Sequence, residues 1–213
     1  MNRNKWIVNL GLGFVKLTGL LPAWLFLKPR VRCVAGARRR LPKPCILVSN
    51  HKSLLDFVLY LIIFPLRTVR FLMAEVLFNK SKLFGWFLGA IGGIRVDRDA
   101  FDFGFVADAI EVLDQGGTVG IFPEGRLPIG GKPWPFTVST AFIATRAPDV
   151  PIVPIYTDGN YGLLKRANVV IGEPMFLADY RREGLDEQEQ LKHLTAVLEQ
   201  KVYALKDEVK QKG

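Results

Sequence analysis

The chain has 213 residues, of which 49% are hydrophobic, and its mean hydropathy is +0.19. This length suits one domain with a sizeable core, and the hydropathy is high for a freely soluble protein. The sequence shows no internal repeat and no low-complexity tract, which excludes repeat arrays and largely disordered chains.

Positive charge is concentrated at the N-terminal end. Residues 1–50 contain ten Lys or Arg and no Asp or Glu, and the net charge of the whole chain is +9. The cations are interleaved with Trp6, Phe14, Trp24 and Phe26. This mixture favours an anionic membrane surface as partner over a nucleic acid, the other polyanion that a basic segment binds.

Residues 6–27 form the most apolar stretch and have nearly the length of a transmembrane helix. Asn9, Lys16 and Pro22 within it are each unfavourable in hydrocarbon. We therefore predict that residues 1–30 are a membrane-anchoring helical segment that lies at the interface without crossing the bilayer. A secretory signal and a plain core helix are alternative interpretations.

The stretch Cys45-Ile-Leu-Val-Ser-Asn-His-Lys-Ser-Leu-Leu-Asp56 combines an apolar run with polar residues at a catalytic spacing. The apolar run predicts a buried strand, and Ser53 is predicted to cap a helix that ends near residue 63. His51 then lies just before the helix and Asp56 in its first turn, so a short turn brings the carboxylate against the imidazole. Such a pair fixes the tautomer and leaves the second ring nitrogen free as a general base. Alternatively, Ser53 and Asp56 form a capping box variant and His51 is an ordinary turn histidine.

The segments that follow predict alternating strands and helices. A strand is expected over residues 69–73, and Ser81 is expected to cap a helix that ends before Gly92-Gly93. Ile94 and Val96 indicate a short strand, after which the Arg98 guanidinium can donate two parallel hydrogen bonds to a phosphate. A surface arginine is the alternative interpretation of Arg98. An amphipathic helix is predicted over residues 105–113.

Phe122-Pro-Glu-Gly-Arg126 leaves the end of another apolar strand, predicted over residues 118–122. Glu124 stands beside the flexible Gly125, at the edge where α/β proteins place their ligands. We expect this carboxylate to belong to a site, although a plain loop carboxylate would have the same local sequence.

The remainder of the chain completes an α/β pattern. Residues 137–145 predict a helix and residues 150–155 an apolar strand with two prolines, for which a structural edge strand is one interpretation. A strand over 169–171 and a helix with one apolar face over 186–210 follow. The fold class expected is a single α/β domain over residues 31–213, with a central mixed β-sheet flanked by helices and preceded by the membrane-binding helix.

Four motifs in this order resemble those of the glycerolipid acyltransferases, the 1-acylglycerol-3-phosphate O-acyltransferase family. Asn50, His51 and Asp56 match its Asn-His-x4-Asp motif, and the segments at 92–98, 122–126 and 150–155 resemble the other three. The likeness covers roughly residues 44–175. It implies that His51 and Asp56 are catalytic. It also implies a substrate-binding set, which is Asn50, Arg98, Glu124, Gly125 and Arg126.

Three positions depart from the family pattern. Arg126 stands where threonine is usual, Ala74 where a lysine is frequent, and Thr137 where a second lysine is expected. Two cations expected near the acceptor phosphate are therefore missing. Either other cations replace them, or the acceptor carries less charge than lysophosphatidate. The candidates for replacement are Arg95, Arg126 and Lys132.

The resemblance implies transfer of a fatty acyl group from acyl-CoA or acyl carrier protein to the sn-2 hydroxyl of 1-acylglycerol-3-phosphate, giving phosphatidic acid. It implies no metal and no other cofactor. The expected partners are membrane lipids, the thioester donor and the lysophospholipid acceptor, and no nucleic acid. The expected location is the cytoplasmic face of the cell membrane, as a peripheral or monotopic protein.

Two alternatives remain at this point. One is an acyltransferase for a different lysolipid, and the other is a catalytically silent membrane lipid-binding protein. Cys33 and Cys45 have no metal-ligand spacing and are expected to be buried or half-buried thiols in a reducing setting.

Overall fold

The fold is described from a computed structural model, which defines residues 10, 13–14, 18–19, 22–97, 104–162 and 164–210. Arg98 and most of the predicted membrane helix lie outside these residues. The helical residues 22–27 are described, and they leave Trp24, Leu25 and Phe26 exposed while Leu27 is buried. Within the described part of the chain, no helix is both long enough and apolar enough to span a bilayer.

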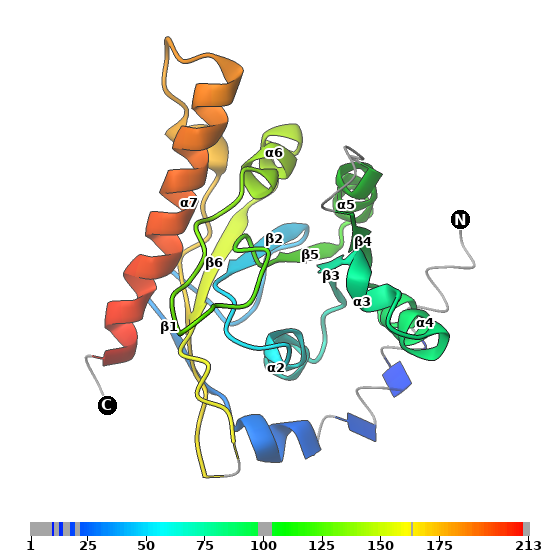
Figure 1. Cartoon of the computed structure of the whole chain (residues 1–213). Helices are drawn as coiled ribbons and strands as arrows, with labels where there is room; N and C mark the ends of the chain where they lie inside the picture. The colour runs from blue at the N-terminus through cyan, green and yellow to red at the C-terminus, as the bar shows by residue number, and fades with distance from the viewer. Residues whose placement is uncertain are drawn as a thin grey trace.

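A seven-stranded mixed sheet forms the centre of the molecule, in the order β1-β7-β6-β2-β5-β3-β4 (Figure 1). Strands β2 to β6 are parallel, whereas β7 is antiparallel to β6 and carries β1 beside it. The central strand β2 is buried along its whole length, as its apolar run predicts. The strands are β1 (Arg30–Cys33), β2 (Cys45–Ser49), β3 (Val69–Ala74), β4 (Ile94–Val96), β5 (Thr118–Ile121), β6 (Ile152–Thr157) and β7 (Asn168–Ile171).

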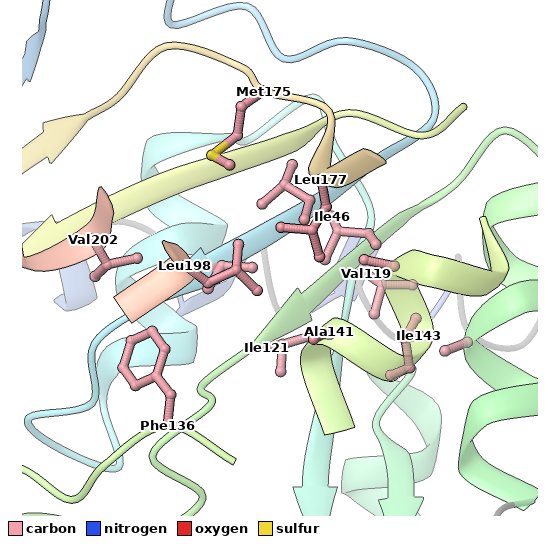
Figure 2. Close-up of a cluster of buried hydrophobic side chains, with 14 of the residues drawn as sticks. Ile46, Val119, Ile121, Phe136, Ala141, Ile143, Met175, Leu177, Leu198 and Val202 are labelled. Atoms are coloured by element: carbon pink, nitrogen blue, oxygen red, sulfur yellow. The ribbon is translucent and has the colours of Figure 1, made fainter. Parts of the chain in front are cut away.

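Helices cover both faces of the sheet, so the core has two halves. One half packs alternate side chains of β2, β3 and β6 against α2 and α4, and the other packs the opposite side chains against α5, α6 and α7. Figure 2 shows the second half, where Ile46 and Val119 of the sheet lie close to Ile143 of α6 and Leu198 of α7. The helices are α2 (Asp56–Ile63), α3 (Glu75–Phe78), α4 (Lys82–Ala90), α5 (Gly104–Asp114), α6 (Ser139–Arg146), the 3-10 helix η1 (Leu177–Tyr180) and α7 (Glu187–Lys210).

The predicted single α/β domain with a mixed sheet is confirmed, whereas two local predictions and one alternative interpretation need correction. Ser53 does not cap α2, because that helix begins at Asp56 and the Ser53 hydroxyl accepts from the Leu55 N–H instead. The strand at 150–155 is not an edge strand, because β6 lies between β2 and β7. Cys33 is exposed rather than half-buried, since it ends the outermost strand β1.

Pro154 is tolerated inside the sheet because the β6–β7 ladder is interrupted beside it. Ile155 pairs with Ile171, whereas Ile152 pairs with Met175, so β7 and the residues after it contribute one more residue than β6 between the two pairings. A proline lacks an N–H and is found at such irregularities or at sheet edges.

The parallel direction of β2 to β6 brings their carboxyl ends to one edge of the sheet. His51 follows β2, Glu124 follows β5 and Tyr161 follows β6 at this edge. Segments far apart in the chain therefore supply side chains to one place, which is the usual position of ligand sites in open α/β sheets.

Candidate active site

Asn50 joins the end of β2 to the end of β6. Its side-chain amide donates to the Thr157 carbonyl at 2.9 Å, and its carbonyl accepts from the Thr157 N–H at 2.8 Å. The side chain is 0% exposed, so both of its polar groups are used within the protein. This contact fixes the direction of the backbone that leaves β2, and therefore the position of His51. A substrate-binding role for Asn50 stays a prediction.

His51 and Asp56 are in direct contact. The Nδ1 atom of His51 lies 2.7 Å from Oδ2 of Asp56. A carboxylate only accepts hydrogen bonds, so Nδ1 carries the proton and Nε2 is the nitrogen with a free lone pair. The His51 side chain is 16% exposed and lines a pocket, whereas Asp56 is 0% exposed. The pair has the geometry of a general base oriented by a buried carboxylate.

The turn before α2 is organised around the Asp56 carboxylate. Oδ2 accepts from the backbone N–H groups of Lys52 at 2.6 Å and Ser53 at 2.9 Å, in addition to His51. Oδ1 accepts from the hydroxyl of Tyr161. Because these donors converge on one buried group, the loop that carries His51 is folded against the first residue of α2.

Glu124 holds the same loop from the other side. Its Oε1 atom accepts from the His51 N–H at 2.9 Å and from the hydroxyl of Tyr203, on α7, at 2.9 Å. Glu124 is 3% exposed, and its Oε2 atom is buried without a hydrogen-bond partner among the described residues. In this structure the contacts of Glu124 position the backbone of His51, and its predicted contact with an acceptor stays a prediction.

Aromatic rings form the floor beneath the imidazole. His51 stacks on Phe122 with the ring centroids 4.4 Å apart and an interplanar angle of 14°. Phe122 stacks in turn on Phe71 of β3, with centroids 5.5 Å apart. The stack covers one face of the imidazole and restricts its rotation, which supports the orientation set by Asp56.

A pocket of about 370 Å³ opens beside His51. Most of its lining is apolar and comes from β3, α3 and α4, with Phe122, Gly125 and Arg126 on the side of β5. Largely apolar pockets with a few polar groups are typical of small-molecule sites, and this lining suits a ligand with an apolar part. The strand at 150–155, which the family resemblance associates with the acyl site, contributes no described residue to this lining.

The cations predicted for the acceptor phosphate are distributed unequally. Arg126 is exposed, lines the pocket and lies with its guanidinium carbon 5.6 Å from the centre of the Trp134 ring. Arg95 instead forms an ion pair with Glu75 at 3.3 Å. Arg98 comes two residues after β4 in the sequence and lies outside the described residues. Gly125 adopts a positive φ of 65°, which glycine reaches without strain and which turns the chain after Glu124 toward the pocket.

Tyr161 and Tyr203 are the two functional contacts that the sequence interpretation missed. Burial, with the nearby Asp56 as a further cause, raises the pKa of Tyr161, and burial together with the Glu124 carboxylate raises the pKa of Tyr203. Both phenols therefore stay protonated donors at neutral pH. Tyr161 follows the end of a predicted strand, which is a position where site residues are expected in α/β folds. For Tyr203, the sequence indicates only a place in an amphipathic helix.

Comparison with known proteins gives one family. A family model described as acyltransferase matches residues 31–158, more than half of the chain. The human 1-acyl-sn-glycerol-3-phosphate acyltransferase beta is 32% identical over 114 residues, which are 53% of this chain and 41% of that protein. The 1-acyl-sn-glycerol-3-phosphate acyltransferase of Bacillus subtilis is 29% identical over 141 residues, which are 65% of this chain and 70% of that protein.

A solved structure extends the likeness to nearly the whole chain. The crystal structure of the 1-acyl-sn-glycerophosphate acyltransferase PlsC from Thermotoga maritima superposes with a TM-score of 0.61 at 25% sequence identity. The match covers 95% of this chain and 81% of that chain. By contrast, the chain spans only 41% of the human relative and 41% of a chloroplastic relative from Brassica napus.

Proposed function

The chain belongs to the acyltransferase family, and from this premise we propose that it transfers a fatty acyl group from an acyl thioester to the sn-2 hydroxyl of 1-acylglycerol-3-phosphate, giving phosphatidic acid. The observation that carries the proposal is the contact of 2.7 Å between His51 Nδ1 and Asp56 Oδ2, with His51 lining a largely apolar pocket. The proposed glycerolipid acceptor is inferred from the relatives, whose names include 1-acyl-sn-glycerol-3-phosphate or 1-acyl-sn-glycerophosphate.

In the proposed reaction His51 is the general base. Its Nε2 atom takes the proton of the acceptor hydroxyl as the oxygen attacks the thioester carbonyl carbon. The imidazolium that forms is stabilised by Asp56. When the tetrahedral intermediate collapses, the carbon–sulfur bond breaks and Nε2 returns the proton to the leaving thiolate. Every proton and bond is accounted for without a further co-reactant.

The pocket supports a lipid substrate. Its apolar lining suits a fatty acyl chain, because transfer of apolar surface out of water is favourable by about 25 cal/mol per Å². Gly125, Arg126 and Arg98 are the proposed contacts of the acceptor glycerol phosphate, with Glu124 and Asn50 as proposed neighbours. The Arg126 guanidinium, which lines the pocket, can bind a phosphate through paired hydrogen bonds.

We propose further that the protein acts at the cytoplasmic face of the cell membrane, with residues 1–30 as anchor and residues 31–213 as acyltransferase domain. Trp24 is 50% exposed, Leu25 46% and Phe26 39%, on a described helical stretch followed by basic residues. Aromatic and aliphatic side chains beside cations favour the interface of an anionic membrane. The donor is acyl-CoA or acyl carrier protein.

The deciding experiment is an acceptor panel assayed with both thioester donors and detection of the released thiol. We expect the wild-type protein to acylate 1-acylglycerol-3-phosphate, and His51→Ala to lose all measurable transfer. The matched control is His193→Ala. His193 is the second histidine of the chain, and it contacts the Tyr180 carbonyl in η1 rather than the residues around Asp56. The control should keep normal turnover.

The outcomes separate the alternatives. Transfer to another lysolipid alone would replace the acceptor but keep the mechanism. Normal turnover of folded His51→Ala would refute the proposed base. Lipid binding without thiol release, for every acceptor and both donors, would indicate a catalytically silent lipid-binding protein.

Membrane attachment is tested by flotation with vesicles that contain anionic lipid. Trp24→Ser should bind less than the wild type, because an exposed indole is lost from the proposed interface. Leu66→Ser is the control, since Leu66 is 96% exposed but lies in the loop before β3, at the opposite edge of the sheet. Equal binding of both variants and the wild type would argue against this surface.

A further inference from the structure

Tyr161 reaches the catalytic pair from a part of the chain that lies beyond the matched family segment, which ends at residue 158. Its hydroxyl donates to Oδ1 of Asp56, while the other oxygen of the same carboxylate contacts His51. The Tyr161 ring packs against the core half that contains α2. A side chain 105 residues away along the chain therefore touches the orienting carboxylate.

The loop that carries Tyr161 is built to lie against the turn before α2. Gly159 has a φ of +69°, and a Cβ atom there would lie 2.5 Å from Cβ of Lys52, so only glycine permits this approach. The Tyr161 N–H donates to the Gly159 carbonyl at 3.0 Å, and the Gly162 N–H donates to the Phe26 carbonyl at 3.3 Å. The position of Tyr161 is thus set by backbone contacts on both of its sides.

The two oxygens of Asp56 have unequal numbers of donors. Oδ2 accepts from His51, Lys52 and Ser53, whereas Tyr161 is the donor recorded for Oδ1 among the described residues. Asp56 is 0% exposed, so water does not take the place of a missing donor at low cost. Without the phenol, rotation of the carboxylate would let Oδ1 accept one of the hydrogen bonds that Oδ2 now accepts. The imidazole would then no longer have a partner in a fixed position.

We propose that Tyr161 is a positioning residue for the acyl transfer: it holds Oδ1 of Asp56, so that Oδ2 stays aimed at Nδ1 of His51. This inference rests on the proposed function for its kinetic consequences but not for its structural ones. Tyr161 has no part in moving the proton. Its effect on the reaction passes entirely through Asp56.

The first test compares Tyr161→Phe with Tyr60→Phe. Each variant loses one hydroxyl that forms a hydrogen bond within the protein, but the Tyr60 hydroxyl bonds to Ser49 and not to Asp56. We expect Tyr161→Phe to lower kcat about tenfold and to leave the KM values of both substrates within about twofold, because a hydrogen bond to a charged group is lost without a change of the pocket. Tyr60→Phe should keep kcat close to the wild type. An equal kcat for Tyr161→Phe and the wild type would overturn the proposal.

The second test is a double-mutant cycle with Asp56→Asn. If Tyr161 acts through the carboxylate, Tyr161→Phe should change kcat by less than about twofold in the Asp56→Asn background, although it costs about tenfold in the wild type. Independent effects that multiply in the double variant would overturn the proposal, because Tyr161 would then act by another route.

The third test needs no substrate and therefore separates this inference from the proposed function. The chain has two histidines, His51 and His193, so the imidazole nitrogen signals of ¹⁵N-histidine protein can be assigned with His193→Ala. We expect the wild type to show His51 as the single Nδ1–H tautomer and Tyr161→Phe to show a mixture, with His193 unchanged. A single tautomer in both proteins would overturn the inference. Absence of acyl transfer by the wild type would overturn the proposed function alone.

Discussion

Replacement of Asp56 by asparagine and by alanine should separate the catalytic role of the carboxylate from its structural role. Asp56 is 0% exposed and accepts from four donors, which are His51 Nδ1, the N–H groups of Lys52 and Ser53, and the Tyr161 hydroxyl. An asparagine can place its carbonyl oxygen where Oδ2 lies and its amide against the Tyr161 oxygen, so that most of these contacts have a partner. Alanine leaves all four donors without this acceptor.

The expected magnitudes follow from these contacts. Asp56→Asn should lower the free energy of unfolding by about 1–2 kcal/mol, because most of the hydrogen bonds persist and only the negative charge of the acceptor is lost. Asp56→Ala should lower it by about 3–5 kcal/mol, because breaking a buried polar network leaves its members unsatisfied. Both variants should lose about 10²–10⁴-fold in turnover, because neither stabilises the imidazolium of His51.

The assay combines urea unfolding with thiol release from the acyl thioester. Stability should rank wild type, Asp56→Asn and Asp56→Ala in descending order, while turnover should fall by similar factors in the two variants. Near-normal turnover of Asp56→Asn would show that the base does not need a charged partner. A loss of stability as large for asparagine as for alanine would refute the assignment of the four contacts.

Three further predictions concern the surroundings of the site. Tyr203→Phe removes one of the two donors to Glu124 Oε1, so the melting temperature should fall by about 2–4 °C and kcat should fall several-fold. No change in either quantity would contradict the hydrogen bond between Tyr203 and Glu124. Arg126→Ala should raise the KM of a phosphate-bearing lysolipid about tenfold and leave the KM of its dephosphorylated counterpart unchanged, whereas equal effects on the two would exclude phosphate recognition by Arg126. Burial raises the pKa of the Cys45 thiol, which is 0% exposed, so a thiol reagent should label Cys33 in the folded protein and Cys45 only in denaturant; equal labelling rates without denaturant would contradict its burial.

Local patterns in the sequence were sufficient to predict much of the fold and the central contact. The apolar run before Asn50 predicts a buried strand, and it is the central strand β2. Ser81 was predicted to cap a helix, and its hydroxyl accepts from the Phe84 N–H at 3.2 Å. The spacing of His51 and Asp56 around a helix start predicts their contact, because only four residues lie between them and a single turn sets the distance. These features depend on neighbours in the chain, which is why the sequence reveals them.

The same local reasoning was wrong for Ser53 and incomplete for Glu124. A serine three residues before an acidic residue is a usual cap, but the Asp56 carboxylate takes the N–H groups of the turn, and the helix begins later. Glu124 was expected to face the acceptor, and the fold also gives it two internal donors. Competition among several donors for one carboxylate cannot be judged from spacing alone.

Only the tertiary structure decided which distant residues complete the site. Tyr161 contacts Asp56 because β6 lies next to β2. Tyr203 contacts Glu124 because α7 packs on the same face of the sheet as the side chain of Ile121, the last residue of β5. The amphipathic pattern of α7 predicts that one face is buried but not which side chain meets the carboxylate. Strand order and helix placement arise from the packing of the whole core, so contacts that depend on them have no signature within any single stretch of the chain.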